Sequence, residues 1–68
     1  MRIKDLREDS NLTQAEIAGF LHIKQNTYSR YENEQRQIPL SCLIALAKFY
    51  KTSTDYILGL TDTRAPYT

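Results

Sequence analysis

Amide, hydroxyl and guanidinium side chains gather on one side of the stretch from Gln25 to Asn33. Its only large apolar residues, Tyr28 and Tyr31, are three apart, as expected for the inward side of a helix. At about 100° per residue, the opposite face and its flanks carry Gln25, Asn26, Thr27, Ser29, Arg30 and Asn33. Such groups can bond the edges of bases, since Asn or Gln suits adenine and Arg suits guanine. Taken alone, the face is equally typical of an exposed polar helix.

The preceding stretch predicts a second short helix that would support this one. Thr13 followed by Glu16 is a capping box, in which each side chain bonds the backbone N–H of the other residue. A helix should therefore begin just after Thr13 and end near Leu21. Its buried side is predicted from apolar residues at three- and four-residue spacing, which are Ala15, Ile17, Ala18 and Leu21. A tight turn of three residues, with Ile23 directed into the core, then leads to the helix from about Gln25 to Glu32.

Three further helices are expected around this pair. Residues 2–9 place Ile3 and Leu6 on a narrow apolar stripe. Pro39 suits the first turn of the next helix, which has the most apolar face: Leu43, Leu46, Ala47 and Tyr50, widened by Cys42, Ala45 and Phe49. Ser53 is the expected N-cap of a last helix, which Gly59 should terminate. We expect one domain over residues 1–60 and a flexible tail over residues 61–68.

Composition excludes several classes of function. A chain of 68 residues buries a small core and leaves no room for a catalytic domain, so we expect no enzyme. One cysteine and one histidine cannot provide a zinc site, and neither a cofactor nor a small-molecule ligand is expected. No apolar run approaches the length that spans a bilayer, and we expect a cytoplasmic protein. The net charge of +1 rules out a uniformly basic surface.

Several spaced motifs together resemble one protein family. LTQAEIA at residues 12–18, TYSRYEN at residues 27–33, IPL at residues 38–40 and STDYILG at residues 53–59 occur in the order typical of it. The chain resembles the Cro/repressor-type helix-turn-helix family, also called the xenobiotic-response-element family, over nearly all of residues 3–59. The resemblance implies an all-α, compact five-helix lambda-repressor-like domain that binds double-stranded DNA and regulates transcription.

The resemblance also assigns roles to individual residues. It implies that the helix near Gln25 enters the major groove while the preceding helix crosses the phosphate backbone. The residues assigned to base readout are Gln25, Asn26, Ser29 and Arg30. Those assigned to the DNA backbone are Gln14, Lys24, Thr27, Asn33, Arg36 and Gln37. Glu32 is expected to orient or pair with Arg30 rather than to read bases.

Three positions depart from the family pattern. His22 and Glu34 stand where the family usually has glycine, and a left-handed backbone is expected at His22. Lys24 stands where a Ser or Thr cap is usual, so the helix after it should begin less firmly.

One copy of so small a domain contacts few bases, and we therefore expect a homodimer on a palindromic operator. The expected interface comprises Tyr56, Leu58 and Leu60. A repressor is the simplest expectation. An alternative remains open, because the same fold can serve as a protein-binding module such as an antitoxin or a repressor partner.

Overall fold

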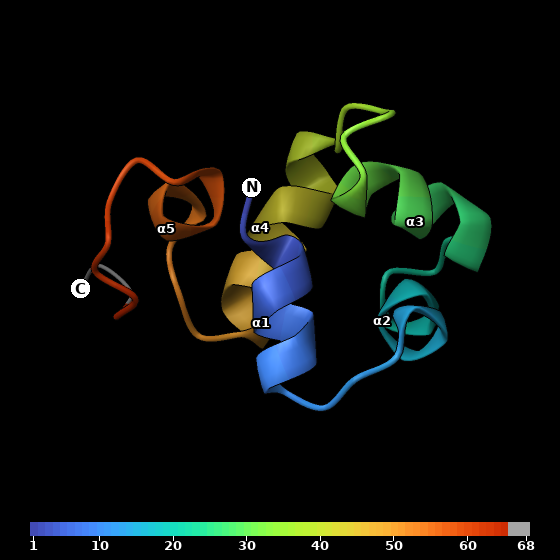
Figure 1. The fold of residues 1–68 in the computed structure, drawn as a ribbon, viewed down its shortest axis with the longest axis horizontal. Helices are drawn as coiled ribbons and strands as arrows, with labels where there is room; N and C mark the ends of the chain where they lie inside the picture. The colour runs from blue at the N-terminus through green and yellow to red at the C-terminus, as the bar shows by residue number, and fades with distance from the viewer. Residues whose placement is uncertain (66–68) are drawn as a thin grey trace.

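The computed structural model describes residues 1–65, and they form five helices in the order α1 (Ile3–Asp9), α2 (Gln14–Phe20), α3 (Gln25–Glu32), α4 (Leu40–Phe49) and α5 (Thr54–Leu58). No strand occurs within this range. In Figure 1, α1 and α4 occupy the centre, α2 and α3 lie on one side of them, and α5 lies on the other. The predicted all-α, five-helix architecture is confirmed. None of the helices in residues 1–65 has the length and apolar character needed to cross a membrane.

The core receives side chains from all five helices. Its buried members are Ile3, Leu6, Ile17, Ala18, Tyr28, Tyr31, Leu43, Leu46, Ala47, Tyr50 and Ile57. The inward direction of both α3 tyrosines is confirmed, with Tyr28 fully buried and Tyr31 3% exposed. Ala15 was expected on the buried side and is exposed, because two residues advance a helix by about 200° and so place Ala15 opposite Ile17. Phe49 lies at the flank of α4 and packs on the exposed Phe20, with ring centroids 4.6 Å apart.

Two of the predicted N-terminal caps are confirmed. Thr13 accepts a hydrogen bond from the Glu16 backbone, and the Glu16 side chain accepts one from the Thr13 backbone. Ser53 caps α5 through the N–H of Tyr56. Lys24 makes no capping hydrogen bond with its side chain, as expected for its residue type. Pro39 was predicted in the first turn of α4. It is instead the N-cap, one residue before that turn.

All five helices end with the same backbone motif. The residue after each C-cap, or the cap itself in α5, has a left-handed conformation, and these residues are Asn11, His22, Glu34, Lys51 and Gly59. At the end of α2, the N–H of Ile23 bonds the carbonyl of Ala18 at 3.0 Å and the N–H of His22 bonds that of Gly19 at 3.2 Å. This pair of bonds is the Schellman arrangement. The left-handed backbone predicted at His22 is confirmed, with φ at 58°.

Arg2 joins the first residues of the chain to α5 and the segment beyond it. Its guanidinium donates hydrogen bonds to the carbonyls of Tyr56 and Thr61 and to the carboxylate of Asp62. It also lies over the Tyr56 ring, 4.3 Å from the centroid. Residues 61 and 62, which belong to the predicted flexible tail, are thus hydrogen-bonded to the body of the domain. The predicted tail also includes residues 66–68, which lie outside the described residues.

Substituting His22→Gly should stabilise the domain by about 1 kcal/mol, because a β-carbon is unfavourable in the left-handed region and glycine has none. For a domain of this size that gain corresponds to a rise of roughly 4–8 °C in Tm. Asn11→Gly is the matched control. Its gain should be smaller, because Asn tolerates the left-handed region better than most residues. Thermal unfolding of both variants measures the difference, and a lower Tm for His22→Gly would contradict the argument.

Candidate nucleic-acid interface

The polar face of α3 points away from the core. Gln25, Asn26 and Arg30 are exposed, whereas Thr27 and Ser29 are half-buried. The two buried tyrosines on the opposite side hold the helix in this orientation. The four residues predicted to read bases therefore share one outward-facing surface, with Ser29 the least accessible of them. Their contacts with bases remain predictions.

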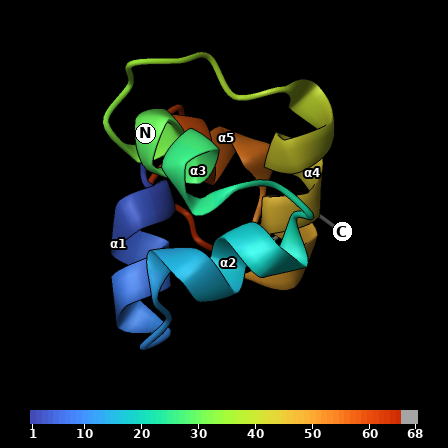
Figure 2. The ribbon, with the colours of Figure 1, turned by 90° about the vertical axis from the view of Figure 1, so that its right-hand side faces the viewer.

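Helices α2 and α3 pack against each other across the turn at residues 22–24. In Figure 2, which views the molecule from the α2–α3 side, both helices lie in front of the others and none of the remaining helices covers them. Ile23 in the turn is half-buried and packs against the core. The two helices thus form one rigid unit with a free outer side.

A buried ion pair connects the inner side of this unit to α1. Arg7 of α1 donates from Nε to Oε2 of Glu32 at 2.6 Å and from Nη2 to Oε1 at 3.2 Å. The Glu32 side chain is 1% exposed and that of Arg7 is 12% exposed. Gln14 of α2 donates from Nε2 to the same Oε1 at 3.1 Å, and Arg7 also bonds the carbonyl of Leu12. One carboxylate therefore connects α1, α2 and α3.

Glu32 was expected to orient or pair with Arg30. It does form an ion pair, but with Arg7, so the expected partner is wrong. Glu32 and Arg30 are two positions apart on α3, so their side chains leave the helix about 200° from each other. Arg30 is exposed on the outer face, while Glu32 is directed to the inner side and bonds Arg7. The amphipathic pattern of residues 2–9 did not identify Arg7 as this partner, because Arg7 and Glu32 are 25 positions apart in the sequence.

The ion pair perturbs the pKa of both partners. Burial by itself would raise the pKa of Glu32, but the hydrogen bonds from Arg7 and Gln14 outweigh it and the net pKa is lowered. The hydrogen bonds that Arg7 donates to Glu32 raise the pKa of Arg7. Tyr28 also lies close enough to influence this carboxylate, but its hydroxyl has no partner of good geometry among residues 1–65. We therefore attribute the lowered pKa of Glu32 to Arg7 and Gln14.

The two buried phenols near this pair remain neutral. Burial raises the pKa of Tyr28, and it raises the pKa of Tyr50 to about 12. Neither hydroxyl forms a hydrogen bond to another described residue. A neutral ring can stay in the core at neutral pH, so Tyr28 can hold α3 without a charge that needs a partner.

The residues predicted to contact the DNA backbone surround the α3 face. Lys24 lies at the N-terminus of α3, and Asn33, Arg36 and Gln37 lie in the exposed loop that follows it. Gln14 differs from these, because it is half-buried and one of its two amide N–H groups bonds Glu32. The other N–H is the donor that a phosphate would use. These backbone contacts remain predictions.

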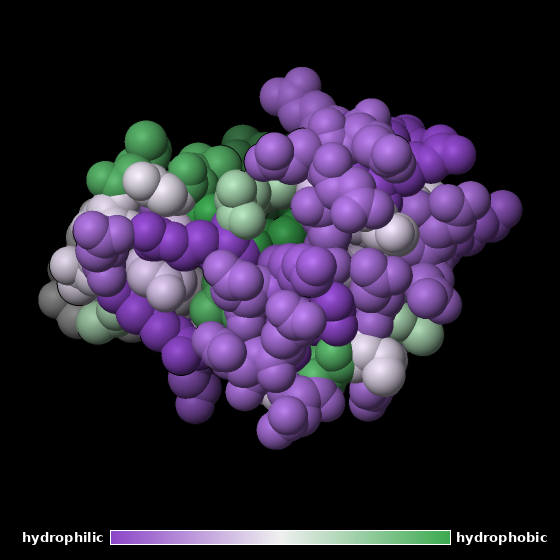
Figure 3. Space-filling view, in the orientation of Figure 1, coloured by the Kyte–Doolittle hydropathy of each residue, from purple (hydrophilic) through white to green (hydrophobic). Residues whose placement is uncertain are grey.

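The surface is divided by polarity. In the space-filling view of Figure 3, hydrophilic residues cover the side of α2 and α3, and apolar residues gather near α5 and the start of α4. Of the residues predicted to form a dimer interface, Leu58 is 46% exposed and Leu60 is 74% exposed. Tyr56 is half-buried beneath the guanidinium of Arg2. Residues 1–65 contain no cluster of three or more His, Cys, Asp or Glu side chains that could hold a metal ion.

Comparison with known proteins gives consistent matches. The family model described as Helix-turn-helix matches residues 3–57. The uncharacterized HTH-type transcriptional regulator YobD of Bacillus subtilis (strain 168) is 42% identical over 65 residues, which are 96% of this chain and 58% of that protein. The HTH-type transcriptional regulator ImmR of the same organism is 40% identical over 85% of this chain and 46% of its own length.

A third relative is the cryptic phage CTXphi transcriptional repressor RstR of Vibrio cholerae, which is 39% identical over 72% of this chain and 44% of its own length. The chain thus spans about half the length of these curated relatives. No solved structure matches it at a significant level.

Substituting Glu32→Gln should destabilise the domain by about 3 kcal/mol, because it leaves the largely buried Arg7 without its counter-charge. The variant should also change how the free energy of unfolding depends on pH in the acid range. The folded pKa of Glu32 lies below the ordinary value of 4.5. Its stabilising contribution is therefore complete above about pH 4.5 and is lost as the pH falls toward the folded pKa.

Urea unfolding between neutral pH and pH 3 measures both effects. Wild type should lose stability steeply over the acid part of this range, and Glu32→Gln should lose less. Glu8→Gln, which removes an exposed carboxylate from α1, is the control and should behave like wild type. Equal acid sensitivity in wild type and Glu32→Gln would show that the Arg7–Glu32 pair does not control the transition.

Proposed function

Because this chain belongs to the Cro/repressor-type helix-turn-helix family, we propose that it is a sequence-specific, double-stranded DNA-binding transcriptional regulator that acts as a repressor. We also propose that it binds DNA in the cytoplasm. The observation that supports the proposal most directly is the outward face of α3, where amide and guanidinium groups are exposed while both tyrosines are buried.

In this proposal, α3 enters the major groove. Gln25, Asn26, Ser29 and Arg30 read base edges, with amides suited to adenine and the guanidinium to guanine. The residues that flank these readers, at the start of α2, around the start of α3 and in the loop after α3, contact phosphates, which set the register of the helix along the groove. The residues assigned to these backbone contacts are Gln14, Lys24, Thr27, Asn33, Arg36 and Gln37.

The buried ion pair improves the electrostatics of this surface. Residues 24–37 contain three cations, Lys24, Arg30 and Arg36, against the carboxylates of Glu32 and Glu34. Because Glu32 is neutralised by Arg7 in the interior, only Glu34 opposes the three cations at the surface. This distribution compensates for a net charge of only +1.

Two copies acting together would double the number of bases read. A homodimer on a palindromic operator fits this need, with half-sites about 34 Å apart so that both α3 helices enter the same side of the duplex. By this mechanism the dimer would prevent transcription by occupying the operator.

Substituting Arg30→Ala should weaken binding to the preferred operator by about 1–3 kcal/mol and relax the preference at one base pair in each half-site. The preferred sequence is first selected from random duplexes, and affinities are then measured for each single-base change. Lys4→Ala, which removes an exposed lysine from α1, serves as the control and should keep the wild-type specificity. Equal weakening on all sequences would make Arg30 a phosphate contact.

Affinity for the operator should fall with salt along a log–log slope of about −0.9 for each phosphate contacted. Substituting Arg36→Ala should make this slope less steep by about one unit without altering base preference. A slope near zero for the wild-type chain would contradict DNA binding and favour a protein-binding module such as an antitoxin or a repressor partner.

A further inference from the structure

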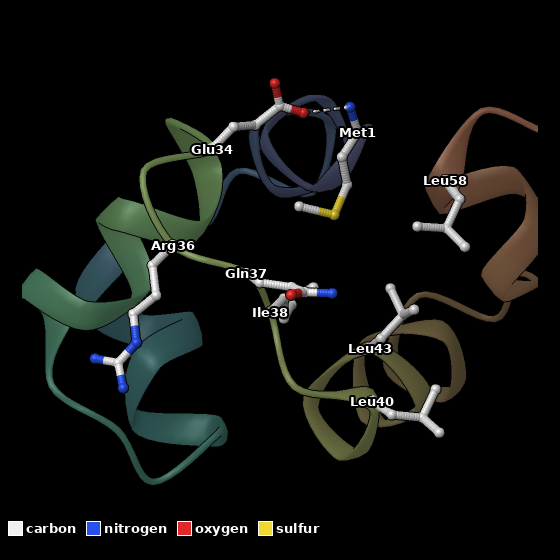
Figure 4. A pocket seen from close by; sticks show the side chains of 8 residues that line it. All are labelled: Met1, Glu34, Arg36, Gln37, Ile38, Leu40, Leu43 and Leu58. Atoms are coloured by element: carbon white, nitrogen blue, oxygen red, sulfur yellow. Dashed lines mark hydrogen bonds and ion pairs between the residues drawn. The ribbon is translucent and has the colours of Figure 1, made fainter.

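An apolar groove opens beside the exit of α3, with a volume of about 610 Å³. Figure 4 shows its side chains converging from the first residue, the loop before α4, the start of α4 and the end of α5. Leu58, one of the residues predicted to form a dimer interface, lines this groove, so the groove belongs to the homodimer already proposed. A smaller hollow lies elsewhere, and the proposed function gives it no role.

The smaller hollow lies between the end of α2 and one side of α4. Its volume is about 230 Å³. The lining residues from α2 and the turn are Phe20, Leu21 and His22, and those from α4 are Ser41, Cys42 and Ala45. Because a cavity of about 150 Å³ is large enough to hold benzene, this hollow can accept one large apolar side chain of a partner.

Exposed aromatic rings extend the apolar surface beyond the hollow. Phe20 is 44% exposed, and its ring centroid lies 4.6 Å from that of Phe49. Phe49 is 40% exposed and does not itself line the hollow. Aromatic side chains are enriched where proteins bind one another, and contiguous exposed apolar surface is typical of such sites. A molecule that only fills the hollow would leave Phe49 uncovered, whereas a polypeptide segment can cover both the hollow and the rings.

Cations border this apolar surface. Lys48 is one helical turn after Ala45 and so continues the row of α4 residues along the hollow. Lys51 follows Phe49 by two residues. Both lysines are exposed, and neither forms an ion pair within residues 1–65. The only carboxylate that α2, the turn and α4 contribute is that of Glu16, which is engaged in its capping box. A partner segment that carries carboxylates therefore complements this surface.

We propose that the hollow and the aromatic pair Phe20–Phe49 bind an acidic segment of another protein. The segment inserts one large apolar side chain into the hollow, packs on the two rings and places carboxylates opposite Lys48 and Lys51. None of these four residues is among those assigned to DNA, so the contact leaves the outward face of α3 free. The inference goes beyond the proposed function and does not rest on it.

Selection from a random peptide library displayed on phage, with the full chain as the bait, tests the chemistry of the partner. The enriched peptides should share a large apolar residue flanked by aspartate or glutamate, because the hollow takes the apolar side chain and the lysines attract the carboxylates. A selection that enriches no peptide, or only peptides without acidic residues, would overturn the proposal.

Two substitutions test whether the enriched peptides bind at this surface. Ser41→Trp places a large side chain at the exposed wall of the hollow, and Lys48→Glu reverses a charge beside it. Each should weaken binding of a synthetic copy of the most enriched peptide by about tenfold or more, as measured by isothermal titration calorimetry. Ile44→Trp and Lys4→Glu are the matched controls, because they introduce the same side chains at exposed positions that do not line the hollow. Both controls should keep the wild-type affinity.

Circular dichroism and thermal unfolding of each variant separate a loss of binding from a loss of structure. Equal peptide affinity in the wild type, Ser41→Trp and Lys48→Glu would show that the peptides bind elsewhere, and it would overturn the proposal. Operator affinity is measured in parallel. A chain that binds acidic peptides at this surface but binds no operator would contradict the proposed function and keep this inference. A chain that binds its operator but selects no acidic peptide would keep the proposed function and overturn this inference.

Discussion

The hydrogen-bonded pair of Arg7 and Glu32 is the constraint on which the rest of the domain depends. Burying a carboxylate and a guanidinium costs several kcal/mol for each ion, and their attraction offsets this only when the remaining hydrogen-bonding groups are also satisfied. Here Glu32 accepts from Arg7 and Gln14, and Arg7 also donates to the carbonyl of Leu12. This geometry requires α1, α2 and α3 to occupy fixed relative positions.

The same pair determines what α3 presents to its surroundings. Glu32 is held on the inner side of the last turn of the helix, which Tyr31 also anchors, and Tyr28 anchors the turn before it. With three contacts on one side, the helix cannot rotate about its axis without exposing a charge or two aromatic rings. The polar groups on its other side are therefore held in one arrangement, as recognition of base edges requires.

Much of the fold follows from local sequence signals. The capping box at Thr13, the cap at Ser53 and the inward tyrosines of α3 were predicted correctly, because each depends on residues within about one helical turn. The left-handed backbone at His22 was predicted from the family resemblance and is also confirmed. The existence and order of five helices followed from the same signals together with the family resemblance.

Contacts between distant residues were not predicted. The partner of Glu32 was assigned to Arg30, which is near in sequence but on the wrong side of the helix, and Arg2 was not recognised as the link to Tyr56 and Asp62. Periodicity describes which side of a helix is buried but not which neighbour faces it. The groove beside α3 was missed for the same reason, since its lining comes from four separate segments.

The shared ending of the helices bears on how the chain acquires its shape. Each reversal after a helix is closed by bonds between residues five or fewer positions apart, such as Ile23 with Ala18 and Leu60 with Asp55. Closing loops this short costs little entropy, and helical domains rich in such contacts fold in microseconds to milliseconds. The bond between Arg2 and Asp62 closes nearly the whole chain. We therefore expect the helices and their turns to assemble early, with the join between the chain's two distant segments completed last.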